Sequence, residues 1–162
     1  MKTKPLFCSP QILTELRGRT AFEVIDELMA HLACLRKVPQ SAKEPIATAV
    51  KNREKTMSTG IGFGIALPHA YSNLIGEAIV MLGRSNEGID FCALDHQPVR
   101  IAVLVIAPAH DRQEHLWILS SVARLFHQKQ IRHAVENAAD AETIATILNN
   151  RSFTSSGLIP YP

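Results

Sequence analysis

Apolar residues recur at helical spacing in the first third of the chain. Thr20 and Glu23 fit a capping box, and the apolar stripe that follows predicts a helix over residues 21–35. The stripe consists of Val24, Ile25, Leu28, Leu32 and Leu35. Residues 1–19 show no such periodicity and are expected to form an irregular lead-in.

A second helix is expected to begin around Glu44–Pro45, because proline suits the first helical turn. Its apolar stripe of Ile46, Ala49 and Val50 ends on Arg53, where the spacing calls for another aliphatic residue. Arg53 is then either a side chain that buries its stem and keeps its charge in water, or a guanidinium carried toward a sheet edge. In the second case, the guanidinium would suit a bidentate contact with phosphate.

Strands are expected in the middle of the chain. Residues 65–69 are a short apolar run with Pro68 near its end, which predicts a strand whose end carries His69. Residues 78–82 and 100–106 are almost continuously apolar, as central strands covered on both faces are. Turn-forming residues lie between these two strands, around at most one short strand.

Helices are expected again in the last third. Asp111 with Glu114 marks one helix start, residues 131–135 fit a short helix, and Asp140 can cap a last one. Helices before, strands in the middle and helices after predict an α/β fold, with a mixed β-sheet flanked by helices. The length of 162 residues predicts one domain over residues 1–150, followed by a C-terminal tail, 151–162.

Composition and charge exclude several classes. Lys and Arg number 17 against 15 Asp and Glu, a net charge of +2, which is too balanced for a nucleic-acid binder. The apolar runs are far shorter than the ~20 residues of a membrane span, and no secretory signal is recognisable. We therefore expect a cytoplasmic protein without membrane insertion. Cys8, Cys34 and Cys92 are expected to be reduced and structural.

Two histidines lie where chemistry is expected. Pro68 restricts the backbone before His69, whose neutral imidazole is a nucleophile near neutral pH. His115 falls in the first turn of the helix after Asp111, where an imidazolium is disfavoured. A neutral His115 can donate a hydrogen bond to a phosphoryl oxygen. The alternative for both is a packed or solvent-facing histidine, and His31, His96, His127 and His133 are taken as surface or helix residues.

Other kinds of site find no support. No metal is predicted, since His110 and His115 have zinc-finger spacing without the paired cysteines, and no HExxH motif occurs. The glycines at 60, 62 and 64 lack the Lys-Ser/Thr of a phosphate-binding loop, and Ile65 replaces the last glycine of a dinucleotide fingerprint. They permit either a close backbone approach or simply a flexible turn. No GxSxG elbow is present.

Taken together, these stretches resemble the fructose/mannitol-type EIIA domain of the bacterial phosphotransferase system. The resemblance covers about residues 5–149 and centres on the motif around His69. It is carried by Arg53-Glu54, Ser58-Thr59-Gly60-Ile61-Gly62, Gly64-Ile65-Ala66-Leu67-Pro68-His69-Ala70, Gly88-Ile89-Asp90-Phe91 with Pro98-Val99, and the segment from His115-Leu116 to Phe126.

The resemblance implies a phosphohistidine carrier fed by a small phosphocarrier protein, HPr or its nitrogen-branch paralogue. His69 would be phosphorylated on Nε2, and His115 would orient or stabilise the phosphoryl group. Arg53 would match the family's arginine near the active site, and Ser58 and Thr59 could donate hydroxyl hydrogen bonds. No metal or cofactor is implied.

Two roles within the family stay open, because the sequence holds no EIIB, HPr or membrane domain. We favour a regulatory, nitrogen-branch EIIA whose phosphorylation state controls partner proteins. The alternative is a sugar-specific EIIA that donates phosphate to a separate EIIB for fructose/mannitol-type uptake. A different class is a non-catalytic binding module that keeps the EIIA fold. A homodimer is compatible with each of these.

Overall fold

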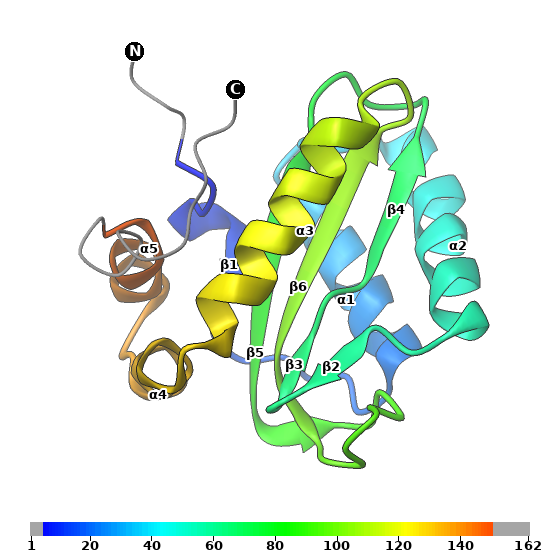
Figure 1. Ribbon diagram of the computed structural model, residues 1–162. Helices are drawn as coiled ribbons and strands as arrows, with labels where there is room; N and C mark the ends of the chain where they lie inside the picture. Colours follow the sequence, from blue (N-terminus) through cyan, green and yellow to red (C-terminus); the bar gives the residue numbers. More distant parts are fainter. Residues whose placement is uncertain (1–4, 151–162) are drawn as a thin grey trace.

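A six-stranded mixed sheet lies between two layers of helices in the computed structural model, which describes residues 5–150 (Figure 1). Helices α1 and α2 cover one face of the sheet, and α3, α4 and α5 cover the other. In chain order the elements are a 3-10 turn, Ser9–Gln11, then β1 Ile12–Leu13, α1 Ala21–Cys34, α2 Gln40–Thr56, β2 Gly60–Gly62, β3 Ile65–Ala66, β4 His69–Ser72, β5 Ile79–Ile89, β6 Val99–Pro108, α3 Arg112–His127, α4 Lys129–Asn137 and α5 Ala141–Asn149.

Strand β6 lies at the centre of the core. Its even-numbered residues from Ala102 to Ile106 pack with α1 and α2, and its odd-numbered residues from Ile101 to Val105 pack with α3, α4 and α5. The alternation follows from the two-residue period of a strand. Because both faces are buried, the strand reads as one continuous apolar run. The central strand predicted over residues 100–106 is thereby confirmed. The strand predicted over residues 78–82 is also present, but β5 runs on to Ile89 and includes residues that were expected to form a turn.

The sheet has the order β1-β5-β6-β3-β2. Strand β4 follows β3 along β6 and pairs with the next part of that strand. Strands β3 and β4 run parallel to β6, β1 runs parallel to β5, and the β5–β6 and β2–β3 pairs are antiparallel. This confirms the predicted α/β class with a mixed sheet. The predicted tail, 151–162, lies outside the described residues.

Both helix starts at Thr20 and Asp111 are confirmed. Thr20 and Glu23 form the expected capping box at α1. The Asp111 carboxylate accepts the backbone N–H of Glu114 at 2.9 Å, and Asp140 likewise accepts the N–H of Thr143 at 2.7 Å at the start of α5. The described part of the chain contains no helix long and apolar enough to cross a membrane.

Two expectations about the first third were wrong. Helix α2 begins at Gln40 rather than around Glu44–Pro45. Pro45 therefore lies inside the helix, and the one hydrogen bond that it cannot donate would end on Ser41, an exposed residue near the helix start. The lead-in is also not wholly irregular, because β1 adds a short parallel edge strand to β5.

The strand predicted over residues 65–69 is divided by Pro68. Strands β3 and β4 flank Leu67 and Pro68, so His69 begins β4 instead of ending a strand. Proline lacks the N–H that a continuous ladder needs, but its carbonyl still accepts the Val105 N–H at 3.0 Å. The chain thus shifts from β3 to β4 without leaving β6.

The three cysteines are free thiols, as expected for reduced residues. The expectation that they are structural was wrong for Cys34 and Cys92, which are exposed and therefore contribute little packing. Cys92 sits at a turn with a φ of 49°.

Candidate active site

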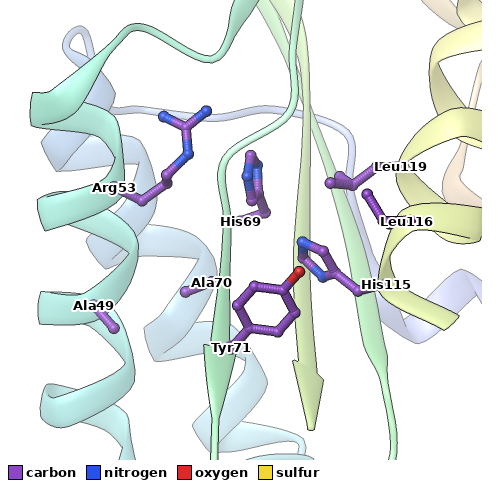
Figure 2. Close-up of a pocket in the computed structure, with 8 residues that line it drawn as sticks. All are labelled: Ala49, Arg53, His69, Ala70, Tyr71, His115, Leu116 and Leu119. Atoms are coloured by element: carbon purple, nitrogen blue, oxygen red, sulfur yellow. The ribbon is translucent and has the colours of Figure 1, made fainter. Parts of the chain in front are cut away.

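A pocket of about 380 Å³ opens between α2, β4 and α3. It brings together Arg53, His69 and His115, which the sequence places on three separate elements (Figure 2). Figure 2 shows α2 on one side, β4 in the middle and α3 on the other. The lining consists of Ala49, Arg53, His69, Ala70, Tyr71, His115, Leu116 and Leu119.

The imidazole of His69 is oriented by the backbone just before it. Its Nδ1 lies 2.8 Å from the carbonyl oxygen of Leu67. A carbonyl oxygen only accepts, so Nδ1 carries the proton and the neutral ring has its lone pair on Nε2. Burial lowers the pKa of His69, and the Arg53 charge lowers it further, against opposing effects of the Leu67 hydrogen bond and of Glu54. The ring is therefore neutral and nucleophilic at pH 7.

His115 lies in the first turn of α3, as predicted, and its side chain is buried. The centroids of the His115 and His69 rings are 5.3 Å apart. Burial lowers the pKa of His115 to about 4, and a charged His69 would lower it too. Its Nδ1 is enclosed without a hydrogen-bond partner. The two histidines form a neutral pair at pH 7.

Arg53 reaches the sheet edge, which favours the second of the two interpretations of the broken apolar stripe. Its Nη1 donates to the carbonyl of Met57 at 2.9 Å, just past the end of α2. That contact holds the guanidinium in place on the wall of the pocket. The other N–H groups of the fork suit an anion in the pocket.

Glu54 anchors the loop that leads to the site by accepting hydrogen bonds from Thr59. It was assigned no role from the sequence. Its buried carboxylate accepts the Thr59 N–H at 3.0 Å and the Thr59 hydroxyl at 2.5 Å. The Thr59 carbonyl accepts the Leu67 N–H at 3.0 Å, and the Leu67 carbonyl accepts from His69. A chain of hydrogen bonds thus runs from α2 to the imidazole. The signal was available, since Glu54 follows Ile46 and Val50 at four-residue steps.

Ser58 and Thr59 lie outside the lining of the pocket. The Ser58 hydroxyl donates to the Phe91 carbonyl at 2.5 Å, and the Thr59 hydroxyl donates to Glu54. Each hydroxyl has one hydrogen, and both are engaged in holding the loop between α2 and β2. A direct contact of these hydroxyls with a phosphoryl group stays a prediction.

The remaining histidines are spread over the molecule. His96, His127 and His133 are exposed as expected, and half-buried His31 bonds the Pro10 carbonyl at 2.9 Å. Within residues 5–150 no three His, Cys, Asp or Glu side chains are grouped so that they could hold a metal ion.

The pattern of the site and the fold agree with a known family. The model of the family described as "Phosphoenolpyruvate-dependent sugar phosphotransferase system, EIIA 2" matches residues 6–151. The chain therefore belongs to the EIIA type-2 family of the phosphotransferase system, whose members act as phosphoryl carriers.

Similar proteins come from two branches of the family. The nitrogen regulatory protein of Escherichia coli K12 is 34% identical over 137 residues, covering 84% of this chain and 80% of that protein. The fructose-specific EIIA component of Haloferax volcanii is 35% identical over 100 residues, covering 62% of this chain. The chain spans 65% of that relative and 23% of the fructose-specific EIIABC component of Bacillus subtilis.

Solved structures support the same fold. The nitrogen regulatory protein IIA-Ntr of Neisseria meningitidis superposes with a TM-score of 0.80 at 27% identity, covering 88% of this chain and 96% of that one. The mannitol IIA of E. coli superposes with a TM-score of 0.74 at 18% identity, covering 88% of this chain and 98% of that one, which supports the fold alone.

Removing the Glu54 carboxylate is expected to destabilise the protein. Glu54→Ala leaves the Thr59 N–H and hydroxyl without their buried acceptor, which lowers the free energy of unfolding by about 2–4 kcal/mol. Urea denaturation measures this. The matched control is Glu44→Ala on the same helix, where the carboxylate is exposed and the change is expected to stay within about 0.5 kcal/mol. Equal stability losses in the two variants would contradict the assigned role.

The low pKa of His115 predicts a stability that falls with acidification. An unfolded chain protonates this histidine near 6.5, the folded chain only near 4. Between these values the unfolded state binds more protons, so stability present at pH 7 is lost as the pH falls. About 2 kcal/mol of the loss between pH 7 and pH 4.5 belongs to His115. His115→Gln removes this titrating group and keeps the others. Its free energy of unfolding is therefore expected to fall about 2 kcal/mol less than that of the wild type between pH 7 and pH 4.5, as urea denaturation at the two pH values measures. An identical fall would place the His115 pKa near its ordinary value.

Proposed function

We propose that the protein is a phosphohistidine carrier that accepts a phosphoryl group on Nε2 of His69 from an HPr-like phosphocarrier. The observation that carries this proposal is the hydrogen bond from His69 Nδ1 to the Leu67 carbonyl. It leaves the Nε2 lone pair as the nucleophile, in a pocket shared with Arg53 and His115. A lone pair fixed in direction favours in-line attack.

The transfer needs positioning and charge stabilisation rather than a cofactor. The Nε2 lone pair of His69 attacks the phosphorus of the donor's phosphohistidine. The donor's N–P bond breaks, and its electron pair returns to the donor imidazole. Charge spreads over the three phosphoryl oxygens as the group passes across, and the Arg53 guanidinium is placed to stabilise it.

His115 is the second donor in this scheme. Its Nδ1 is buried and unpartnered, and a buried orphan N–H is rarer than an under-satisfied acceptor. The favoured neutral tautomer of His115 therefore carries its proton on Nε2, and this N–H donates to an oxygen of the phosphoryl group on His69. Because the pKa of His115 lies far below neutrality in the free protein, this donor is uncharged when the phosphoryl group arrives.

Within the family we propose a regulatory, nitrogen-branch EIIA. Two similarities support this branch: 34% identity to the nitrogen regulatory protein of E. coli over 84% of this chain, and a TM-score of 0.80 at 27% identity to IIA-Ntr of N. meningitidis. In this role the two added negative charges of the phosphoryl group switch contacts with cytoplasmic target proteins.

The alternative is a sugar-specific EIIA. It is supported by 35% identity to the fructose-specific component of H. volcanii and by 31% identity to the fructose-specific EIIABC component of B. subtilis over 92% of this chain. One neighbour in fold is a mannitol IIA in complex with phosphorylated IIB. A binding module without transfer chemistry is the third candidate, and the intact set of Arg53, His69 and His115 argues against it.

A relay assay tests the proposal. The protein is mixed with phosphoenolpyruvate, enzyme I and a phosphocarrier, and intact mass reads the acid-labile phosphate. We expect one phosphoryl group per chain, and no labelling by HPr or its nitrogen-branch paralogue would contradict a carrier role. Adding a purified fructose-type EIIB then separates the branches, since rapid loss of the label to EIIB indicates sugar transport and retention indicates regulation.

A further inference from the structure

The orientation of the His115 imidazole is set by packing against a neighbouring aromatic ring and not by a hydrogen bond to its Nδ1. Its Nδ1 has no hydrogen-bond partner, so no acceptor or donor there sets the angle of the ring. The ring of Tyr71 packs on it with centroids 4.3 Å apart and planes inclined by 43°. This is closer than the 5.3 Å between His115 and His69. Figure 2 shows the Tyr71 ring directly against His115.

Tyr71 is itself fixed on both sides. It lies two residues beyond His69 on β4, so both side chains face α3, and its backbone pairs with Ala107 of β6. The guanidinium carbon of Arg112 lies 5.3 Å from the centroid of its ring, within the range of a cation–π contact. At 37% exposure the ring lies at the mouth of the pocket, between His115 and water.

We propose that Tyr71 is a positioning residue that clamps the His115 imidazole so that its Nε2 points at the phosphoryl group on His69. The proposal deepens the proposed function and rests on it. The aromatic ring is the part that acts, because the contact is between the two tilted rings, and the phenol hydroxyl is not required. Tyr71 touches neither the donor nor the attacking Nε2 in this scheme.

Other groups around His115 do not replace the clamp. The polar groups facing it are His69 from β4, Arg53 across the pocket from α2 and, on its own helix, Arg112, which packs on the outside of Tyr71. The rest of the nearby wall is aliphatic, from Leu116 and Leu119. Loss of the Tyr71 ring therefore leaves the imidazole free to turn and open to water.

The test compares Tyr71→Leu, which removes the ring, with Tyr71→Phe, which keeps it. In Tyr71→Leu we expect the NMR-measured pKa of His115 to rise toward 6.5 as water enters. The maximal rate of phosphorylation at saturating phosphocarrier is expected to fall about tenfold, with little change in KM. Tyr71→Phe is expected to keep the low pKa and to stay within about twofold of the wild-type rate. Leu74→Ala, an exposed apolar residue outside the pocket, is expected to change neither quantity.

Two results would overturn the proposal. One is an unchanged His115 pKa in Tyr71→Leu, and the other is an equal loss of rate in Tyr71→Phe and Tyr71→Leu. Circular dichroism and the unfolding midpoint confirm that each variant is folded, and Tyr71→Phe retains the packing if Tyr71→Leu does not. The titration needs no phosphoryl donor, so it tests the contact between Tyr71 and His115 independently of the carrier function. If the carrier function is wrong, the wild-type protein is not labelled in the relay assay.

Discussion

His69→Ala is expected to abolish phosphoryl acceptance. The substitution removes the Nε2 lone pair that attacks the donor in the proposed scheme, and the free Nδ1 of His115 is enclosed and cannot take its place. We expect labelling to fall by at least about a thousandfold, since the covalent intermediate can no longer form. Because His69 is half-buried at the start of an edge strand, the unfolding midpoint is expected to change little. Intact mass after incubation with phosphoenolpyruvate, enzyme I and the phosphocarrier measures the result.

The matched control is His133→Ala, which removes an exposed histidine on α4, away from the lining of the pocket. It is expected to label at the wild-type rate. Persistent labelling of a folded His69→Ala variant would show that another residue carries the phosphoryl group. Loss of labelling in both variants would point to a general effect of histidine removal and not to the pocket.

The second large effect is expected for His115→Ala. The acceptor nitrogen remains, so the protein still takes up one phosphoryl group. The rate falls by about a hundredfold, since one preorganised donor to the developing charge is lost. Rapid-quench kinetics at saturating phosphocarrier measure the rate, and a long incubation measures the final extent. A wild-type rate would remove His115 from the scheme, and loss of the final extent would make it an acceptor instead of a donor.

His115→Gln is the companion variant. Its amide N–H₂ can donate where the imidazole N–H did, so part of the rate is expected to return. A rate as low as that of His115→Ala would indicate that the ring, clamped by Tyr71, is needed as well as the donor.

The elements that the sequence predicted well are those governed by local rules. The capping residues Thr20, Asp111 and Asp140 mark helix starts by their own side-chain chemistry, and β6 shows its double burial as an unbroken apolar run. The short pairings were not predictable in this way. Strand β1 is only two residues long, and its identity depends on pairing with β5, some 70 residues later.

The residues of the site also differ in whether local sequence rules could predict them. His69 and Arg53 stand out locally, one after a proline and the other at the end of an apolar stripe. Tyr71 and Glu54 were overlooked because their roles depend on what packs against them. Strand alternation places Tyr71 beside His69, but its contact with His115 needs α3 to lie over β4. Glu54 could be suspected from its stripe position, whereas its acceptor role requires Thr59 to fold back on the helix.

The most direct test of the carrier proposal is to locate the phosphoryl group in the labelled protein. Nitrogen-15 and phosphorus-31 NMR of the phosphorylated chain distinguish Nε2 from Nδ1, and peptide mapping assigns the histidine. The hydrogen bond from Nδ1 to Leu67 predicts a single phosphoryl group on Nε2 of His69. A phosphoryl group on Nδ1, or on His115, would contradict the account.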